Sequence, residues 1–311
     1  MKKPNHFLDL DSFDKSTLRK ILNAAARLKK ERKKGNLKKY LADKKLAMIF
    51  EKPSTRTRVS FEAGIIELGG SAISLNHTDI QLGRGESVAD TARVLSRYVD
   101  MIMIRCFHHQ TLLEMAKNSS IPVINGLTDY SHPCQIMADI LTFEERKGDI
   151  GKKVITWIGD SNNVTTSWIH AACLLGFEFR ISSPETMLPA AEIMRWAEAH
   201  GGNAKIYSDM HVALKNSDCI VTDCWLSMGQ EENLGETATR KKTEDLKPFQ
   251  VNEDVMRLAK KDAIFMHCLP AHRGEEVTAS VIDGPQSAIW DEAENRLHAQ
   301  KAVMLWCLGE K

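Results

Sequence analysis

Short apolar runs alternate with longer stretches in which apolar residues recur at helical spacing. In the first half, the runs with the length of buried strands lie at residues 46–50, 71–75, 101–104 and 122–125. The stretches with helical spacing lie at residues 18–28, 61–68, 86–98 and 112–118. Either Asp14 or Ser16 would cap the first helix, and Gly35 would end it. Strands and helices that alternate in this way predict a mostly parallel sheet with helices on both faces.

The second half repeats this alternation after a longer helix. That helix is predicted at residues 133–146, with Pro133 at its first position and Gly148 after its end, and we place the domain junction there. The later strands are predicted at residues 153–158, 178–181, 205–207, 219–222 and 263–267, and the later helices at 164–175, 188–200 and 293–308. We therefore predict an α/β protein of two doubly wound domains with mostly parallel sheets, linked by interdomain helices. Such sheets bind ligands beyond the carboxyl ends of their strands.

Composition restricts the classes of partner. The 311 residues include 42 Lys and Arg against 41 Asp and Glu, a net charge of +1, which argues against a general nucleic-acid surface. The seven cysteines form no paired CxxC motif, so we expect reduced thiols in a cytoplasmic compartment and no structural metal. Residues 1–10 lack the apolar core of a signal peptide, and no stretch has the apolar length of a membrane span.

An anion site is predicted at the start of the helix that follows the first strand. Ser54 is placed to cap this helix, whose first-turn N–H groups have no partners within the helix and favour a negative charge. The hydroxyls of Thr55 and Thr57 add donors, and Arg56 adds a planar group that binds phosphate oxygens in pairs. The other interpretation is an ordinary capped surface helix with solvated arginines.

Further polar side chains follow two predicted strands. Arg105 comes directly after the strand at 101–104, and His132 and Gln135 begin the helix that follows the strand at 122–125. A histidine and an amide at such a place can exchange hydrogen bonds with a small ligand. Each residue also has a plain structural interpretation, in which Arg105 forms a surface ion pair and the other two belong to a capped helix.

The turn at residues 159–163 bears on nucleotide binding. It reads G-D-S-N-N between a predicted strand and a predicted helix. A dinucleotide site at this turn would need the pattern G-x-G-x-x-G, and only Gly159 is present. An NAD-dependent oxidoreductase is therefore not supported.

The ends of two later strands carry candidates for an amine site. Asp223 precedes a polar segment with Ser227 and Met228, which together could hold an ammonium group, although Asp223 could also only cap a turn. Cys268 follows the last predicted strand, beside His267. A locally lowered pKa would make this thiol reactive, whereas most free cysteines are small buried hydrophobes.

Four motifs carry a resemblance to a known family. They are S-T-R-T-R at residues 54–58, H-P-C-Q at 132–135, Asp223 with S-M-G at 227–229, and H-C-L-P at 267–270. In order and spacing they resemble the carbamoyltransferases, closely the ornithine carbamoyltransferases, over nearly the whole chain. The resemblance implies a carbamoyl phosphate domain at residues 1–146, an ornithine domain at 147–291, and a C-terminal helix at 292–311 that returns to the first domain.

The resemblance also implies a role for each matching residue. Those implied to bind carbamoyl phosphate are Ser54, Thr55, Arg56, Thr57, Gln81, Arg105, His132, Pro133, Cys134, Gln135, Cys268, Leu269 and Arg296. Those implied to bind ornithine are Asn163, Asp223, Ser227 and Met228. Arg105, His132 and Cys268 would be catalytic. Gln81 would reach into the site of a neighbouring subunit, so the resemblance implies a homo-oligomer, a trimer or a multiple of trimers.

The implied reaction moves the carbamoyl group of carbamoyl phosphate to the side-chain amine of L-ornithine. Citrulline and phosphate would form, in arginine biosynthesis, without a metal or an organic cofactor. Asp223 and Cys268 would orient the ammonium group, with Cys268 as general base or proton acceptor. Arg105, His132 and Thr57 would stabilise the charge that grows on the carbonyl oxygen.

Two alternatives stay open beside this function. The first is a carbamoyltransferase for another amine, such as putrescine or an acylated ornithine. The second is a catalytically silent homologue that serves as a binding subunit, which the loss of a motif residue would favour. No motif position is changed in this chain.

Overall fold

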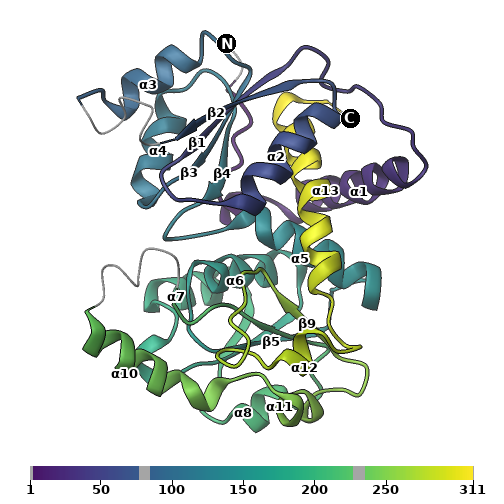
Figure 1. Ribbon diagram of the computed structural model, residues 1–311, viewed down its shortest axis with the longest axis vertical. Helices are drawn as coiled ribbons and strands as arrows, with labels where there is room; N and C mark the ends of the chain where they lie inside the picture. The colour runs from purple at the N-terminus through teal and green to yellow at the C-terminus, as the bar shows by residue number, and fades with distance from the viewer. Residues whose placement is uncertain (1–2, 77–84, 227–234, 311) are drawn as a thin grey trace. The chain divides into compact units, whose positions relative to one another are not determined.

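The computed structural model describes residues 3–76, 85–226 and 235–310. The chain divides into two compact units, one formed by Met1–Leu141 and Glu294–Lys311 and the other by Thr142–Ala293 (Figure 1). Each unit is built on its own parallel sheet, with strands and helices that alternate along the chain. The predicted α/β class with doubly wound, parallel sheets is confirmed.

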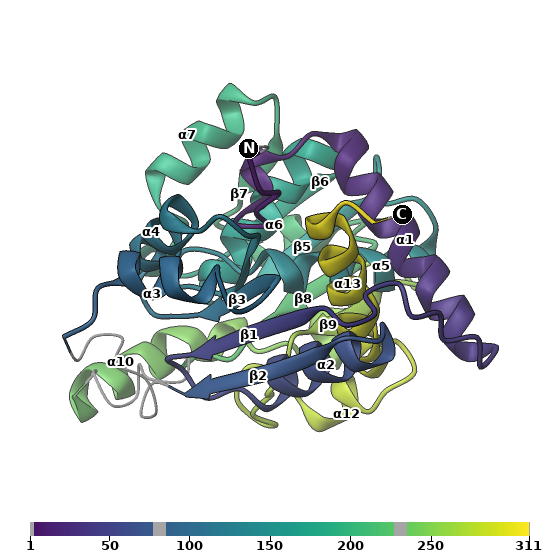
Figure 2. The same ribbon diagram turned by 90° about the horizontal axis from the view of Figure 1, so that it is seen from above.

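The sheet of the first unit has four parallel strands in the order β2-β1-β3-β4. They are β1 (Lys45–Phe50), β2 (Ser71–Asn76), β3 (Met101–Arg105) and β4 (Val123–Leu127). Figure 2 shows β1 and β2 side by side, running in the same direction. The chain steps from β1 to β2 on one side and then returns to the other side of β1 as β3. The strand order therefore reverses between β1 and β3, and ligands bind at the carboxyl ends of strands at such a switch point.

Burial explains why the central strands were visible in the sequence. All five residues of β3 are buried, and so is every residue of β1 except Lys45, because helices cover both faces of a parallel sheet. The edge strand β2 is mostly exposed. Within the apolar stretch at residues 61–68, Ile66 is 53% exposed, because neighbouring helix positions face different directions and Ile65 takes the buried one.

The helices specific to the first unit are α1 (Lys15–Lys33), α2 (Thr55–Glu67), α3 (Val88–Leu95) and α4 (His109–Asn118), with a short 3-10 helix η1 (Leu10–Ser12). Of the two caps considered for α1, Asp14 is the one used, and its side chain accepts the Thr17 N–H at 2.7 Å. Helix α3 is shorter than predicted because Ser87 caps it and accepts the Asp90 N–H.

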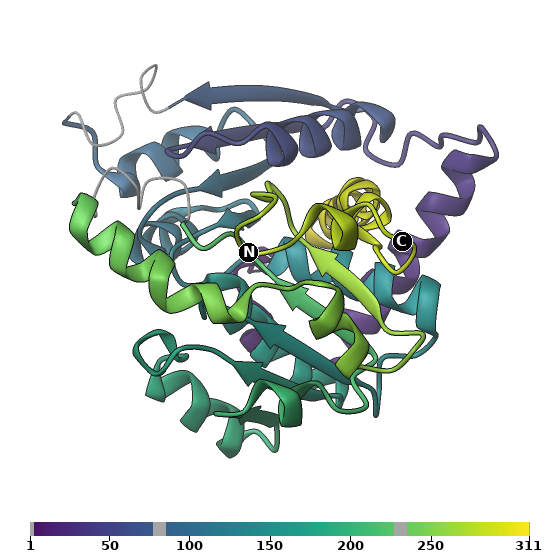
Figure 3. The same ribbon diagram turned by 60° about the horizontal axis from the view of Figure 1, so that its bottom comes forward.

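The sheet of the second unit has five parallel strands in the order β7-β6-β5-β8-β9. They are β5 (Val154–Ile158), β6 (Glu178–Ser182), β7 (Asn203–Ile206), β8 (Cys219–Thr222) and β9 (Ile264–His267). Figure 3 shows these strands as arrows that change from teal to yellow-green. The strand order reverses between β5 and β8, so this unit has a switch point of its own. Strand β7 begins earlier than predicted, because it is largely exposed and has little apolar signal.

The helices specific to the second unit are α6 (Asn163–Leu175), α7 (Ala191–Ala199), α8 (Met210–Leu214), α10 (Glu236–Leu246), α11 (Glu253–Leu258) and α12 (Ala279–Ile282), with 3-10 helices η3 (Glu185–Met187) and η4 (Lys247–Phe249). The apolar pattern predicts only α6 and α7 among these helices. Helix α10 has a single buried residue, Leu246, and so has no apolar stripe. Helices α8, α11 and α12 are 5, 6 and 4 residues long, too short to show a period.

Two helices contain the boundaries between the units. Helix α5 (Pro133–Lys147) begins at Pro133, as predicted, and α13 (Ile289–Leu308) begins earlier than its predicted start at residue 293. The added turn of α13 carries the buried residue Ile289. Among the described helices, none combines the length and apolar surface that a bilayer crossing requires.

In the first unit, α13 packs against α1 and α2. A Cβ on Gly64 of α2 would lie 3.2 Å from the Lys301 Cγ, so glycine permits the close approach of these helices. The Lys301 Nζ forms an ion pair with the Glu67 carboxylate at 2.7 Å, and the Lys29 Nζ of α1 donates to the Asn295 Oδ1 at 2.8 Å. These contacts fix α13 beside the helix whose first turn is the predicted anion site.

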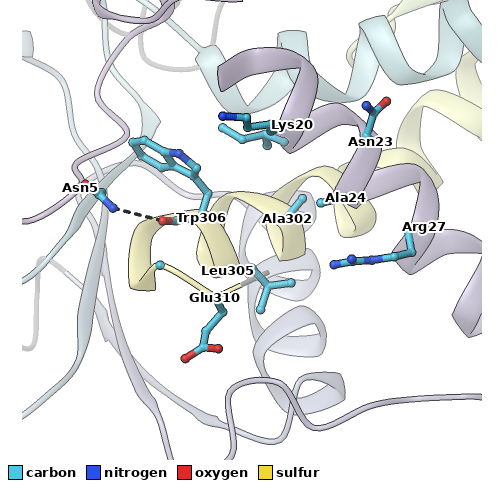
Figure 4. A pocket seen from close by; sticks show the side chains of 11 residues that line it. Asn5, Lys20, Asn23, Ala24, Arg27, Ala302, Leu305, Trp306 and Glu310 are labelled. Carbon is cyan, nitrogen blue, oxygen red and sulfur yellow. Dashed lines mark hydrogen bonds between the residues drawn. The ribbon is translucent and has the colours of Figure 1, made fainter. Parts of the chain in front are cut away.

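A pocket of about 970 Å³ lies between α1 and the end of α13 (Figure 4). Its lining includes Ile21, Leu305 and Trp306. The Asn5 side chain donates to the Trp306 carbonyl at 3.4 Å (Figure 4). None of its lining residues belongs to the predicted substrate sites. We therefore assign the pocket no part in the chemistry.

Candidate active site

The end of β1 and the start of α2 form the predicted anion site. Ser54 is the N-cap of α2, and its Oγ accepts the Thr57 N–H at 3.2 Å. A helix start of this kind carries partial positive charge and N–H groups that have no partners within the helix. The Arg56 Nε is buried and makes no hydrogen bond with the described residues, so its guanidinium is suited to a ligand oxygen.

The second arginine of the same helix turn is used differently. Arg58 donates to the Asn76 Oδ1 of β2. Its guanidinium also lies over the Phe50 ring, 5.0 Å from the ring centroid. Arg58 is therefore a structural residue, whereas Arg56 on the same helix is suited to bind a ligand.

Two further arginines extend the positive charge of this site. Arg105 ends β3 and is 8% exposed, and its carbonyl accepts the Glu51 N–H at 2.9 Å, which ties β3 to the loop after β1. The Arg296 Nη2 donates to the Thr57 Oγ1 at 2.7 Å, and both residues are buried. Helix α13 thus delivers a guanidinium to the first turn of α2.

These positive charges act on His132, the residue before α5. Burial lowers the pKa of His132 well below its ordinary value, and the charges of Arg296, Arg105 and Arg56 lower it further. The imidazole is therefore neutral at neutral pH. Burial, with the charge of Arg105, also lowers the pKa of Lys52 in the loop after β1. A bound anion would relieve the repulsion among these groups.

The first turn of α5 orients an amide beside His132. The Gln135 Nε2 donates to the Asp139 Oδ1 at 2.7 Å, and both residues are buried. The Cys134 Sγ donates to the Asn125 carbonyl of β4 at 3.3 Å, and burial raises the pKa of Cys134 to about 12. Gln135 is thus held in a fixed orientation, while the Cys134 thiol points toward β4 of the first sheet.

In the second unit, Asp223 lies at the switch point between β5 and β8. The Asn162 Nδ2 donates to its Oδ2 at 2.7 Å, and the Cys224 N–H donates to its Oδ1 at 2.8 Å. The Cys268 Sγ also donates to the Oδ1, at 3.1 Å. These donors fix a carboxylate that is 8% exposed and suited to pair with an ammonium group.

A second carboxylate lies near Asp223. The Asp160 Oδ2 accepts a hydrogen bond from the Lys242 Nζ of α10 at 2.7 Å. Burial raises the pKa of Asp160, the Lys242 hydrogen bond opposes this shift, and the charge of Asp223 adds to it. This part of the second unit therefore has negative character, in contrast to the arginine cluster of the first unit.

The state of the Cys268 thiol corrects an expectation from the sequence. Burial raises the pKa of Cys268 well above its ordinary value, and the negative charge of Asp223 raises it further. The lowered pKa on which a reactive thiolate would depend is not found. Cys268 is a protonated thiol that donates a hydrogen bond to Asp223.

Two groups of described residues have metal-ligand chemistry. The donor atoms of Asp223, His267 and Cys268 lie within 4.8 Å of one another, and so do those of a second group, His272, Glu275 and Glu276. In the first group, the Cys268 thiol already bonds to Asp223. In the second, Glu276 already accepts the His272 N–H. We assign no metal to either group.

Gln81, Ser227 and Met228 lie outside the described residues, and Asn163 is the first residue of α6. Asn162 was not among the predicted binding residues, although its capping-box pattern with Thr165 marked it as fixed at the turn after β5.

The contact of Asp160 with Lys242 had no signal in the sequence. The two residues are 82 positions apart, and Lys242 lies on a helix without an apolar stripe. The position of Lys52 next to the anion site was equally hidden, because a single lysine in a loop is usually solvated.

Family models match both halves of the chain. Residues 5–145 match the carbamoyl-P binding domain of aspartate/ornithine carbamoyltransferase, and residues 151–307 match the Asp/Orn binding domain of the same family. Together the two models cover nearly all of the described residues.

Individual relatives match over the whole chain. An ornithine carbamoyltransferase from Nitrobacter winogradskyi is 54% identical over 309 residues, which are 99% of this chain and 98% of the relative. An ornithine carbamoyltransferase from Agrobacterium fabrum is 53% identical over 309 residues, which are 99% of this chain and 99% of the relative. The solved ornithine carbamoyltransferase from Pyrococcus furiosus is 47% identical with a TM-score of 0.92, over 97% of this chain and 96% of that one. An anabolic ornithine carbamoyltransferase from Campylobacter jejuni is 41% identical with a TM-score of 0.90, over 99% and 100%.

We expect Cys268 to resist alkylation at neutral pH. Because its pKa is raised, the thiolate that attacks iodoacetamide is scarce. Peptide mass spectrometry after timed labelling should show a rate for Cys268 that rises about tenfold per pH unit from about pH 7 to about pH 9, below the rate of a free thiol. A rate that levels off below about pH 8 would contradict the protonated thiol.

We expect His132 to make stability depend on pH. The unfolded residue takes up a proton near 6.5 and the folded one only at lower pH, so the unfolded state binds more protons between these values and stability rises with pH there. The free energy of unfolding, measured with urea from about pH 5 to about pH 6.5, should rise with pH more steeply for the wild type than for His132→Gln. The difference in slope should be up to about 1.4 kcal/mol per pH unit. Equal slopes for the two proteins would show that His132 is not held neutral.

Proposed function

The chain belongs to the aspartate/ornithine carbamoyltransferase family, and we propose that it transfers the carbamoyl group of carbamoyl phosphate to the side-chain amine of L-ornithine. The products are citrulline and phosphate. The observation that carries this proposal is the cluster of Arg56, Arg105 and Arg296 around a neutral His132. A cluster of this kind suits a compact dianion that also carries a carbonyl group.

The phosphate group is proposed to bind at the first turn of α2. Ser54, Thr55 and Thr57 offer hydroxyl donors there, and Arg56 offers a guanidinium whose Nε makes no hydrogen bond with the described residues. The partial charge of the helix start adds to this attraction. Arg105 would bridge the phosphate and the carbonyl oxygen.

The carbamoyl group is proposed to lie against the start of α5. A neutral His132 is a hydrogen-bond donor that suits the carbonyl oxygen, and it stays a donor as negative charge grows there. Asp139 takes the NH₂ group of Gln135, so the Gln135 Oε1 is presented as an acceptor for the carbamoyl NH₂. Pro133, Cys134 and Leu269 would line the group, and Arg296 would add positive charge.

Ornithine is proposed to bind at the switch point of the second unit. Asp223 is a fixed carboxylate for an ammonium group, and Asn163, Ser227 and Met228 complete the proposed set. Because Cys268 is protonated, we propose that it orients Asp223 and the attacking amine and does not act as the base. This replaces the general-base role implied by the resemblance.

The chemical step then needs little further help from the protein. The side-chain ammonium group of ornithine first loses a proton to water, which leaves a neutral amine. The amine nitrogen then forms a bond to the carbonyl carbon, and the C–O bond to phosphate breaks. The departing phosphate accepts the second proton, which the nitrogen loses as the ureido group forms. Residues 1–146 would bind carbamoyl phosphate, residues 147–291 ornithine, and the helix at 292–311 would serve the first domain.

The second substrate is tested against other amines. Putrescine lacks the α-amino acid group that Asp223 and Asn163 are proposed to hold, and an acylated ornithine lacks the α-ammonium charge. A product assay with carbamoyl phosphate should give citrulline from ornithine at a kcat/KM at least about tenfold above that of either rival. A rival that matches or exceeds ornithine would overturn the choice of substrate.

Arginine biosynthesis in the cytoplasm is the proposed setting. The similar enzyme from Campylobacter jejuni is described as anabolic, which supports this direction. The chain is proposed to assemble as a homotrimer, or a multiple of trimers, in which Gln81 of one subunit reaches the site of its neighbour.

We expect Arg56→Ala to weaken carbamoyl phosphate binding by about 10- to 100-fold, because a charge-assisted hydrogen bond contributes about 1.5–3 kcal/mol. The matched control is Arg58→Ala, which removes an equal charge two positions further along the same helix. The Arg58 guanidinium lies over the Phe50 ring and is not proposed to bind the ligand. Isothermal titration with carbamoyl phosphate should show the loss only for Arg56. Equal losses for both variants would mean that a general charge effect, not a built phosphate site, binds the ligand.

We expect two impaired variants to restore each other's activity when they are mixed and assayed at a carbamoyl phosphate concentration that saturates neither. In a trimer of Arg56→Ala and Gln81→Ala chains, some sites receive an intact Arg56 from one chain and an intact Gln81 from its neighbour. Mixing under conditions that exchange subunits should recover citrulline production, and light scattering should report a trimer or a multiple of it. If no activity returns although hybrids form, Gln81 does not act across subunits.

A further inference from the structure

The segment at residues 267–272 carries Cys268 and Leu269, and both of its ends bind one oxygen atom. The Glu276 Oε1 accepts a hydrogen bond from the His267 Nε2 at 3.2 Å and another from the His272 N–H at 2.6 Å. His267 and Glu276 are both fully buried. Glu276 therefore joins the two ends of the segment, and we call His267 and Glu276, with these hydrogen bonds, the bracket.

The protonation of His267 follows from its second contact. The Leu269 N–H donates to the His267 Nδ1 at 2.9 Å, and an N–H can only donate. The Nδ1 is thus the acceptor, and the ring carries its single proton on Nε2, where it is donated to Glu276. The His267 ring thus links the Glu276 carboxylate to the main chain of Leu269 through one hydrogen bond at each ring nitrogen.

Leu269 has a backbone that needs such support. Its φ of 59° lies in the left-handed region, which is rare for a bulky residue. Residues held in sparsely populated conformations persist when their surroundings fix them, and they concentrate at functional sites. The side chain of Leu269 packs against a buried apolar cluster that contains Val251 and Val277, so its main chain is held on two sides.

Glu276 is itself anchored in the core of the second unit. Its carbonyl accepts the Val251 N–H at 2.8 Å, and its neighbour Val277 is fully buried and forms a bridge with Val251. At the other end, the His267 N–H donates to the Glu292 Oε2 at 2.8 Å. The bracket thus connects a rigid core to the segment that carries the thiol.

We propose that His267 and Glu276 are positioning residues, which hold the Cys268 thiol and the Leu269 main chain in the geometry that carbamoyl transfer requires. The inference rests on the proposed function, in which Cys268 orients the attacking amine and Leu269 lines the carbamoyl group. In this proposal the pair moves no proton during the reaction and acts only through geometry.

Two substitutions of His267 separate its two contacts. His267→Asn keeps an acceptor near the position of Nδ1 for the Leu269 N–H but loses Glu276, whereas His267→Gln keeps a donor for Glu276 but loses Leu269. Both should lower kcat, and the Gln variant by more, about 10- to 100-fold, since a misplacement of about 1 Å costs about that much. The affinity for carbamoyl phosphate alone should stay within about twofold of the wild type.

Substitutions of Glu276 supply the conservative rescue. Glu276→Gln keeps an acceptor oxygen and should retain most of the kcat, while Glu276→Met removes both hydrogen bonds and should lose it. Glu275→Met is the control, because Glu275 is half-exposed and its only ion pair is a long contact to His272 at 3.7 Å among the described residues. It should behave as the wild type, and thermal unfolding should show that all variants are folded.

The outcomes separate this inference from its rivals. Wild-type kcat in Glu276→Met and His267→Gln, or losses in Glu276→Gln equal to those in Glu276→Met, would overturn it. A shift of the kcat pH profile in Glu276→Gln would also overturn it, because that would show proton transfer by the pair.

A measurement without turnover keeps the test independent of the proposed function. If the wild type makes no citrulline, the function fails, but ¹⁵N NMR of labelled histidine still reports on the bracket. The signal that disappears in His267→Asn should be that of a neutral ring protonated at Nε2 in the wild type. A ring protonated at Nδ1, or protonated twice at neutral pH, would contradict the bracket.

Discussion

The first unit depends on one costly arrangement, the gathering of buried positive charge at the switch point between β1 and β3. Arginine cannot lose its proton in a protein, so Arg105 and Arg296 remain charged although they are buried. Burial lowers the pKa of His132 and the arginine charges lower it further, so this side chain is neutral and adds no positive charge. The remaining positive charge has a natural partner in a phosphate dianion, and the fold supports it with a helix start on one side and α13 on the other.

The switch point of the second unit carries negative charge, in contrast to that of the first unit. Asp223 is fixed by side-chain and main-chain donors. A second carboxylate, Asp160, lies near enough to Asp223 for the charge of Asp223 to raise the pKa of Asp160. Burial raises the pKa of the Cys268 thiol, and the same negative charge raises it further, so the thiol stays protonated. A site with this character suits a substrate that arrives as an ammonium ion, and the transfer of a carbamoyl group joins such a substrate to an anionic one.

Sequence reasoning was strong where the signal is local and weak where it depends on distant residues. The buried strands β1 and β3 read as continuous apolar runs, and the cap at Ser54 was visible because capping residues are adjacent in sequence. By contrast, the pKa of His132 is lowered by burial and then by arginines from three separate elements. The pKa of Cys268 is raised by burial and then by Asp223, 45 positions away. Helix α10, which supplies Lys242, has no apolar stripe because only Leu246 on it is buried. Burial and long-range charge decide these features, and neither can be read from a short window of sequence.

A crystal structure with carbamoyl phosphate bound would show whether the arginine cluster of the first unit is a carbamoyl phosphate site. We expect phosphate oxygens within hydrogen-bond distance of the Ser54 hydroxyl and the Arg56 guanidinium, with the carbonyl oxygen at His132. Carbamoyl phosphate bound elsewhere, for example in the pocket between α1 and α13, with none at the first turn of α2, would contradict this assignment.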